Sequence, residues 1–326
     1  MNAWRWTAAV VLVLVAAWGG RPASAQTPQE IEKQAAKANQ KATHKELAAI
    51  KLKGEEQFEQ LRALCVNADG NLLACDTAKS VIRVISPEGK LVATWKPEMM
   101  PEAVAALPDG TVFAAGEGKL AKLDKAGAVV KKVDIGGKMT SALAASEKDV
   151  FASVWADTGF TVVRFNHELG GRKKIVDSLR GCCGTLDLAT YQGDVYVAEN
   201  ARHQVVRYDR DGKVVAKWGQ SDGTKIEGFA SCCNPMNLCV TPTGEVITAE
   251  SGPDRVKRYS GDGKYLGLVG WFAGGKSCRC VDIALSPDGQ RVYVGDSTSN
   301  TIRVLASKGA VAAGGPGQAR ADDGPK

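Results

Sequence analysis

Histidine is scarce in this sequence of 326 residues, which has only His44, His167 and His203. This scarcity excludes a metal centre built from several imidazole ligands. No C-x-x-C-H motif occurs, which excludes covalently attached c-type haem. The sequence also lacks a stripe of lysine and arginine interleaved with aromatic residues, so we expect no nucleic-acid partner.

Long apolar runs are also missing. The run "AAVVLVLVAAW" is about half the roughly 20 residues that a transmembrane helix needs. It follows Arg5 and precedes "RPASA", a pattern that predicts a secretory signal peptide over residues 1–25, cut after Ala25. Arg5 lacks a second arginine beside it, so export in a folded, cofactor-loaded state is not expected. The sequence thus predicts a periplasmic or secreted chain without a transmembrane span.

The two ends of the predicted mature chain differ from its middle in composition. Residues 26–48 are rich in Ala, Lys, Gln and Glu, which predicts an exposed helical segment with His44 as one of its solvated residues. Residues 307–326 lack bulky apolar side chains, which predicts a disordered tail. Between these ends, the repeats described next predict a single domain over residues 49–306.

Six sequence units follow one another with a period of 40 to 50 residues, which is typical of propellers. Each unit has short alternating runs separated by turns such as "PDG", "PTG" and "RDG", and these predict an antiparallel sheet of four strands. One such blade cannot bury both of its faces alone. The predicted fold is therefore all-β, a six-bladed β-propeller preceded by a short N-terminal helix.

The sixth unit lacks a clear fourth strand. Residues Ile50 to Lys53 alternate just before the first unit, so we expect this N-terminal segment to complete blade six and close the ring. The segment "GAVAA" at 309–313 is the alternative fourth strand.

Two of the units, "NPMNLCVTPTGEVITAESGPDRVKRYSGDGKYLG" and "CVDIALSPDGQRVYVGDSTSNTIRVL", resemble NHL repeats over a region of about residues 58–306. The resemblance implies a six-bladed propeller. It also implies a binding platform for a protein or small-molecule ligand, since NHL propellers often serve in this way. Related six-bladed rings include lactonases and an amidating lyase, so the resemblance leaves the chemistry open.

The nine cysteines fall into two groups when the units are aligned on their first turns. Cys65, Cys75 and Cys239 occupy positions where other units have alanine or glycine, which indicates small core residues. The other six lie in the loops that lead into the innermost strands of three consecutive blades, at one predicted mouth of the channel. They are Cys182, Cys183, Cys232, Cys233, Cys278 and Cys280.

Two further sets of residues are predicted at the same mouth. Met99, Met100 and Met139 lie at or beside the cysteine offset in blades two and three, and His203 follows strand two of blade four. These four are candidate additional metal ligands. Second strands end on the same face with an acid, and the simplest interpretation of these acids is structural, as acceptors that cap the blade. They are Asp76, Glu199, Glu250 and Asp296.

The six loop cysteines admit two kinds of chemistry. Paired cysteines in an exported protein are first expected to form disulfides, although cross-blade bonds require the loops to lean inward and bonds within a doublet are strained. Alternatively, thiolates and thioethers hold a soft metal ion, Cu or Zn. The sequence therefore predicts a binding platform with a cysteine-lined site at one channel mouth. The alternative is a redox enzyme or a lactonase-like hydrolase, the latter with Ca bound by Glu199, Asn237, Glu250 and Asp296.

Overall fold

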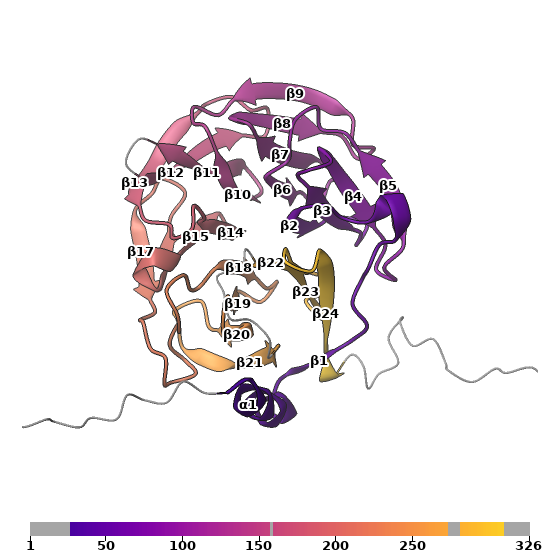
Figure 1. The fold of residues 1–326 in the computed structure, drawn as a ribbon. Coiled ribbons are helices and arrows are strands. Elements are labelled where there is room, and N and C mark those ends of the chain that lie inside the picture. Colours follow the sequence, from indigo (N-terminus) through magenta and orange to yellow (C-terminus); the bar gives the residue numbers. More distant parts are fainter. Residues whose placement is uncertain (1–26, 157–158, 273–280, 310–326) are drawn as a thin grey trace, which may run out of the picture.

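The chain folds into six antiparallel sheets of four strands each, arranged as the blades of a closed ring (Figure 1). This computed structural model describes residues 27–156, 159–272 and 281–309. The innermost strands are β2, β6, β10, β14, β18 and β22, and they surround a central channel. The six-bladed propeller predicted from the repeats is confirmed.

The first three blades follow one another directly along the chain. Blade one has β2 (Leu61–Val66), β3 (Leu72–Asp76), β4 (Val81–Ile85) and β5 (Leu91–Trp95). Blade two has β6 (Ala103–Ala106), β7 (Val112–Gly116), β8 (Lys119–Leu123) and β9 (Val129–Asp134). Blade three has β10 (Thr140–Ala145), β11 (Asp149–Ala156), β12 (Gly159–Asn166) and β13 (Lys173–Leu179).

The last three blades carry the cysteine loops. Blade four has β14 (Asp187–Tyr191), β15 (Asp194–Glu199), β16 (Gln204–Tyr208) and β17 (Val214–Trp218). Blade five has β18 (Asn237–Val240), β19 (Val246–Ala249), β20 (Arg255–Tyr259) and β21 (Tyr265–Trp271). Blade six has β22 (Val281–Leu285), β23 (Arg291–Asp296), β24 (Thr301–Ser307) and, as its outermost strand, β1 (His44–Glu46). The helix α1 (Pro28–Gln40) and two 3-10 turns, Gly54–Glu56 and Asn200–Arg202, complete the described elements.

Tight turns join the strands, and their sequences explain why each blade folds back on itself. In the turn between β16 and β17, Asp209 Oδ1 accepts hydrogen bonds from the N–H groups of Asp211 and Lys213 at 3.0 and 2.9 Å. Gly212 in the same turn has φ of 94°, a region that side chains disfavour. A Cβ atom at this position would also lie 1.9 Å from the carbonyl oxygen of Ile175. Glycine is therefore required here both by conformation and by space.

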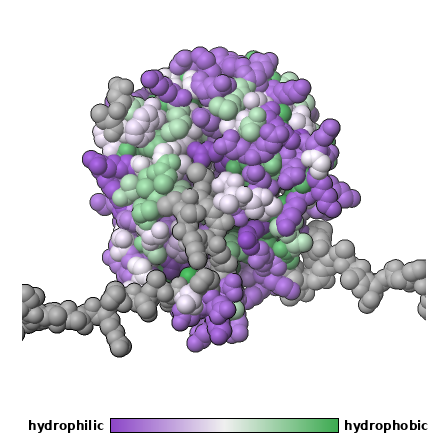
Figure 2. Space-filling view, viewed as in Figure 1, coloured by the Kyte–Doolittle hydropathy of each residue, from purple (hydrophilic) through white to green (hydrophobic). Residues whose placement is uncertain are grey.

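The hydrophobic core consists of six clusters, each of which joins two neighbouring blades. The cluster between blades four and five contains Tyr196, Phe229 and Tyr259, for example, and the cluster between blades six and one contains Ile302 and Leu64. Polar residues cover most of the surface seen in Figure 2, with smaller apolar groups between them. The core thus stabilises the ring as a whole, because no blade buries its faces without both neighbours.

The N-terminal segment closes blade six, but with different residues from those predicted. His44–Glu46 pairs with Leu305–Ser307 of β24, whereas Ile50 of the predicted segment Ile50–Lys53 adds only an isolated bridge to Ile302. The N–H of Lys308 donates to the Thr43 carbonyl, so the chain is still ordered past Ser307, where the tail was predicted to begin. The alternative strand at 309–313 lies, apart from Gly309, outside the described residues.

The helix predicted over residues 26–48 is shorter than expected and is docked on blade five. It spans Pro28–Gln40, with Thr27 and Glu30 forming a capping box at its start. Asn39 anchors its end, since its side chain donates to the Trp271 carbonyl and accepts from the Trp271 N–H at 2.8 and 2.9 Å. The helix cannot continue to residue 48 because the Thr43 and His44 backbones pair with β21 and β24. Among the described residues, no helix combines the length and apolar character needed to cross a membrane.

His44 is a buried strand residue, which corrects the prediction that it is solvated. Its Nδ1 lies 2.9 Å from Thr43 Oγ1, and 8% of the residue is exposed. Burial, helped by the positive charge of Arg258, lowers the pKa of His44 from 6.5 to about 4. Protonating His44 therefore opposes closure of the ring.

We expect the stability of the protein to fall as the pH is lowered from about 6.5 to about 4, because the unfolded chain then binds a proton that folded His44 rejects. The full effect of this one group is about 3 kcal/mol at 1.36 kcal/mol per pKa unit. Urea unfolding at pH 7.5 and pH 4.5 measures it, and His44→Leu should remove that part of the pH dependence. An unchanged pH dependence in His44→Leu would contradict this assignment.

Candidate functional site

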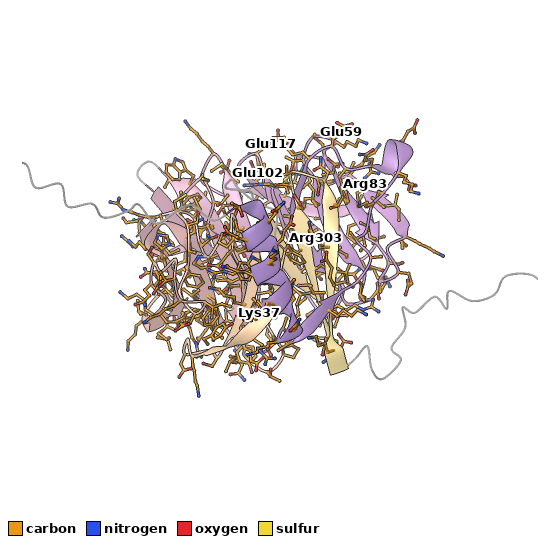
Figure 3. All side chains as sticks on the ribbon, turned by 60° about the horizontal axis from the view of Figure 1, so that its bottom comes forward. Lys37, Glu59, Arg83, Glu102, Glu117 and Arg303 are labelled. Atoms are coloured by element: carbon orange, nitrogen blue, oxygen red, sulfur yellow. The ribbon has the colours of Figure 1, made fainter. Side chains whose placement is uncertain are left out.

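The loops that lead into the innermost strands lie on the same face of the ring as the ends of the second strands. In Figure 3, Glu59 and Glu102, which precede β2 and β6, lie at the same end of the molecule as Glu117, which follows β7. In blade four, Glu199 Oε1 accepts from the Arg180 N–H at 3.0 Å. In blade five, Glu250 Oε1 accepts from the Ala230 N–H at 2.9 Å.

The predicted acids are engaged in contacts within the protein. Asp76 accepts from the N–H groups of Glu59 and Gln60 at 3.2 and 3.0 Å, in the same way as Glu199 and Glu250 hold their loops. Asp296 accepts from the N–H groups of Thr298 and Ser299 in its own turn. These contacts are those of acceptors that fix the loops.

Two asparagines that the sequence analysis did not single out hold the cysteine loops in place. Asn200 Oδ1 accepts from the Cys182 N–H at 2.6 Å. Asn234 exchanges hydrogen bonds with the backbone of Ser251, accepting from its N–H at 2.7 Å and donating to its carbonyl at 2.9 Å. Each loop is therefore tied to the segment that follows its second strand, which limits the movement of the thiols.

The four described loop cysteines form one cluster of sulfur atoms centred on Cys233. The Cys233 Sγ lies 2.7 Å from that of Cys182, 3.4 Å from that of Cys183 and 3.3 Å from that of Cys232. Within the first doublet, the Cys182 and Cys183 Sγ atoms are 3.8 Å apart. Cys233 is buried, whereas Cys183 and Cys232 are exposed. Cys278 and Cys280 lie outside the described residues.

The shortest sulfur distance joins two blades and not the two members of a doublet. The loops do lean toward each other, as a cross-blade bond requires. The two sulfur atoms are 2.7 Å apart, close enough for a bond to form between them with little movement of the loops. Four thiolates around a tetrahedral ion at a Zn–S distance of 2.3 Å lie about 3.8 Å apart. The Cys233 sulfur lies closer than this to its three neighbours, so it would have to move away from them to share an ion. The cluster can therefore chelate one soft ion or form a Cys182–Cys233 disulfide.

The candidate additional ligands lie in different surroundings. Met99 is buried in the cluster between blades one and two, and Met100 is partly exposed. The Met139 methyl group lies beside the blade-four cysteine loop, 3.7 Å from where a Cβ of Gly184 would stand. The His203 Nδ1 lies 3.1 Å from the Asn234 carbonyl and so contacts the blade-five loop through its backbone.

Another sulfur atom, that of Met236, lies directly below the cysteine loops. Met236 is buried, and its Sδ accepts hydrogen bonds from Thr185 Oγ1 and Asn200 Nδ2 at 3.3 and 3.7 Å. Thr185 and Met236 both line the central channel, so these two residues connect the cysteine loops with the channel. The sequence does contain a signal that could have identified Met236, because this residue closely follows the second cysteine doublet in "CCNPM".

The remaining described cysteines differ from the cluster. Burial raises the pKa of the Cys65, Cys75 and Cys239 thiols well above the usual range. Such thiols are poor nucleophiles and poor metal ligands, because both roles require the thiolate. This agrees with their interpretation as small core residues.

Comparisons with known proteins identify the fold but no family. No family model matches the sequence, and no curated protein matches it. Among solved structures, a streptogramin B lyase is similar with a TM-score of 0.56 and 12% identity, over 79% of this chain and 96% of that one. A gluconolactonase from Xanthomonas campestris has a TM-score of 0.57 and 14% identity, over 77% and 86%. Hydrazine synthase of Kuenenia stuttgartiensis has a TM-score of 0.56 and 12% identity, over 79% and 97%. At these identities, the similarity establishes the six-bladed propeller alone.

Proposed function

We propose that this chain is an exported propeller of the NHL type that works as a binding platform, with a soft-metal site at one mouth of its channel. The thiols of Cys182, Cys183, Cys232 and Cys233 are the ligands, and Zn or Cu(I) is the ion. The observation that carries the proposal is the convergence of four sulfur atoms from two adjacent blades around the buried Cys233.

Metal binding accounts for more of this arrangement than a disulfide does. A single Cys182–Cys233 bond would use two of the four thiols and leave Cys183 exposed in an oxidising compartment. A tetrahedral thiolate site would use all four, and thiolates select soft ions such as Cu(I) and Zn. The proposal for export rests on the sequence pattern around Arg5 and Ala25.

The lactonase-like alternative would need Glu199 and Glu250 as ligands for Ca²⁺. Glu250 is already held by Arg255 and Lys257 and accepts from the Ala230 N–H, and Glu199 accepts from Arg180, Arg202 and Gln204. Recruiting either acid to an ion would leave a cation or a loop N–H without its acceptor. We therefore favour the thiol site over an oxygen-ligand site at these acids.

We expect the protein, purified without chelator or reductant, to carry about one Cu or Zn ion per chain, as a four-thiolate site would. Elemental analysis measures the ion, and alkylation followed by intact mass counts the free thiols after denaturation with a chelator. The variant Cys182→Ser, Cys233→Ser should lose at least about nine-tenths of the metal, because it removes half of the ligand set.

The control is Cys65→Ala, Cys239→Ala, which replaces two channel cysteines with the residue that other blades have at this position. This variant should keep the wild-type metal content. A wild-type protein that contains no metal and in which Cys182 is disulfide-bonded to Cys233 would overturn the metal proposal. Equal metal loss in both double variants would also count against it.

A further inference from the structure

The central channel has a polar half and an apolar half. On the channel wall, each innermost strand has one position that pairs with a residue at or near the end of the second strand. In blades one, two and three this position is alanine, in the pairs Ala63↔Cys75, Ala103↔Ala115 and Ala142↔Ser153. In blades four, five and six it is an acid or amide, in the pairs Asp187↔Ala198, Asn237↔Ala249 and Asp282↔Gly295. All six residues line the channel, and polar ones occur in the blades whose loops contain the cysteines.

The three polar residues form a connected row. Asn237 Nδ2 donates to Asp282 Oδ1 at 3.2 Å, and Asp187 Oδ2 accepts from the Leu238 N–H at 2.7 Å. Asp282 also accepts from the Leu64 N–H, which links the row to blade one. The Asn237 Oδ1 atom is buried and accepts no hydrogen bond from the described residues. Buried polar atoms in native proteins almost always have a partner, so this acceptor indicates a missing donor.

A positive charge faces the row from the adjacent blade. Arg62 lies on β2, lines the same channel, and forms no hydrogen bond or ion pair with the described residues. Its charge lowers the pKa of Asp282, whereas burial and the neighbouring Asp187 raise that pKa more strongly. Burial also raises the pKa of Asp187 to about 7. Burial thus disfavours the charged form of both acids, and the charge of Arg62 offsets this in part at Asp282.

The channel has a volume of about 280 Å³, and much of its remaining wall consists of small residues such as Ala105, Ala144 and Ala189. This volume is just below the roughly 300–1,000 Å³ of small-molecule sites, which limits the channel to a small ligand. The wall offers acceptors on one side and an unpaired guanidinium on the other. These wall residues match a ligand that has no net charge but carries both a cationic hydrogen-bond donor and an anionic group.

We propose that the channel binds a small zwitterion of amino-acid size. Its ammonium group donates to Asn237 Oδ1 and to the carboxyl groups of Asp187 and Asp282, and its carboxylate pairs with Arg62. The inference does not depend on a metal at the thiols, because none of these four residues belongs to the sulfur cluster.

Isothermal titration of the full chain with glycine, alanine and serine tests the proposal, with ethylamine, acetate and CaCl₂ as comparison probes. At least one amino acid should bind, and at least about tenfold more tightly than ethylamine or acetate, since each of these probes lacks one charge-assisted contact. If none of the amino acids binds, or if CaCl₂ binds and they do not, the channel is not a zwitterion site.

Two variants test the contacts of the ligand's carboxylate and of its ammonium group one at a time. Arg62→Met should weaken amino-acid binding at least about tenfold and leave ethylamine binding unchanged, because only the carboxylate contact is lost. Asp187→Ala, Asp282→Ala introduces the residue of blades one to three and should abolish binding of the amino acid. Arg172→Met, which removes an exposed arginine of blade three, is the control and should bind as the wild type does. Equal binding by Arg62→Met and Arg172→Met would overturn the role of Arg62.

Discussion

A variant that begins at residue 51 is expected to lose the cooperative unfolding transition that a variant beginning at residue 27 shows. The shorter chain lacks the fourth strand of blade six, His44–Glu46, and leaves the edge of β24 without its partner. It also lacks Ile50 and Leu47, which pack in the cluster between blades six and one. Burial of an aliphatic side chain of this size stabilises a fold by about 1.5–3 kcal/mol. Together with the strand pairing, the loss is comparable to the roughly 5–15 kcal/mol that stabilises a whole domain.

Circular dichroism during urea unfolding measures the effect, and size-exclusion chromatography detects the association expected of an exposed strand edge. A third variant, beginning at residue 42, separates the strand from the helix. It lacks α1 but keeps β1 and Ile50, so it should unfold cooperatively at a somewhat lower urea concentration. If the variant beginning at residue 51 is as stable as the one beginning at residue 42, then β1 does not close the ring in solution.

The substitution Glu250→Gln is expected to destabilise the protein by about 3–5 kcal/mol, the range seen when one partner of a buried ion pair is removed. The Glu250 side chain is fully buried beside two cations, Arg255 and Lys257, whose side chains are 7% and 0% exposed. Lys257 has further hydrogen bonds to the carbonyls of Ile226 and Gly228 at 3.1 and 2.7 Å, in the segment that leads to the blade-five cysteines. With a neutral amide at position 250, both charges would remain buried without an anion.

Differential scanning calorimetry measures this loss, which corresponds to a decrease in Tm of roughly 10 °C for a chain of this size. Glu245→Gln is a matched control in the same blade, because Glu245 pairs with Arg258 where both side chains are about 30% exposed. That pair should contribute no more than about 1 kcal/mol. Similar Tm values for the two variants would contradict the structural role of Glu250 and reopen its interpretation as a ligand for an ion.

Much of the fold could be predicted from the sequence because its information is local and repeated. Turns such as "PDG" and "RDG" and the alternation of apolar residues occur in most units, so a weak pattern in blades two and three was supported by strong ones elsewhere. The sequence analysis placed the closing strand a few residues too late because it relied on this alternation. His44–Glu46 has three polar residues and no alternation, and it becomes a strand only because the edge of β24 is free to pair with it.

The candidate site could be predicted only in part. The repeat alignment placed Cys182, Cys183, Cys232 and Cys233 at one position of two loops, and the sulfur atoms of Cys182, Cys232 and Cys233 all lie within 4.8 Å of one another. It did not single out Asp187 or Asp282, and it named Asn237 only as a candidate Ca ligand, because one polar residue on an alternating strand is ordinarily solvent-exposed. The spacing offered a signal, since an acid or amide follows each of the first two doublets in "CCGTLD" and "CCNPMN".

The sequence by itself determined what each blade contains: four short strands, an acid near the end of the second strand in most of them, and cysteine doublets before two of the innermost strands. Hydrogen bonding and turn formation act between residues close along the chain, so their pattern is written in the local sequence. Only the tertiary structure decided that Cys182 approaches Cys233 more closely than its neighbour Cys183. Distances between blades depend on how all six pack around the ring and how each loop is tied down by Asn200 and Asn234, and no single repeat encodes that closure.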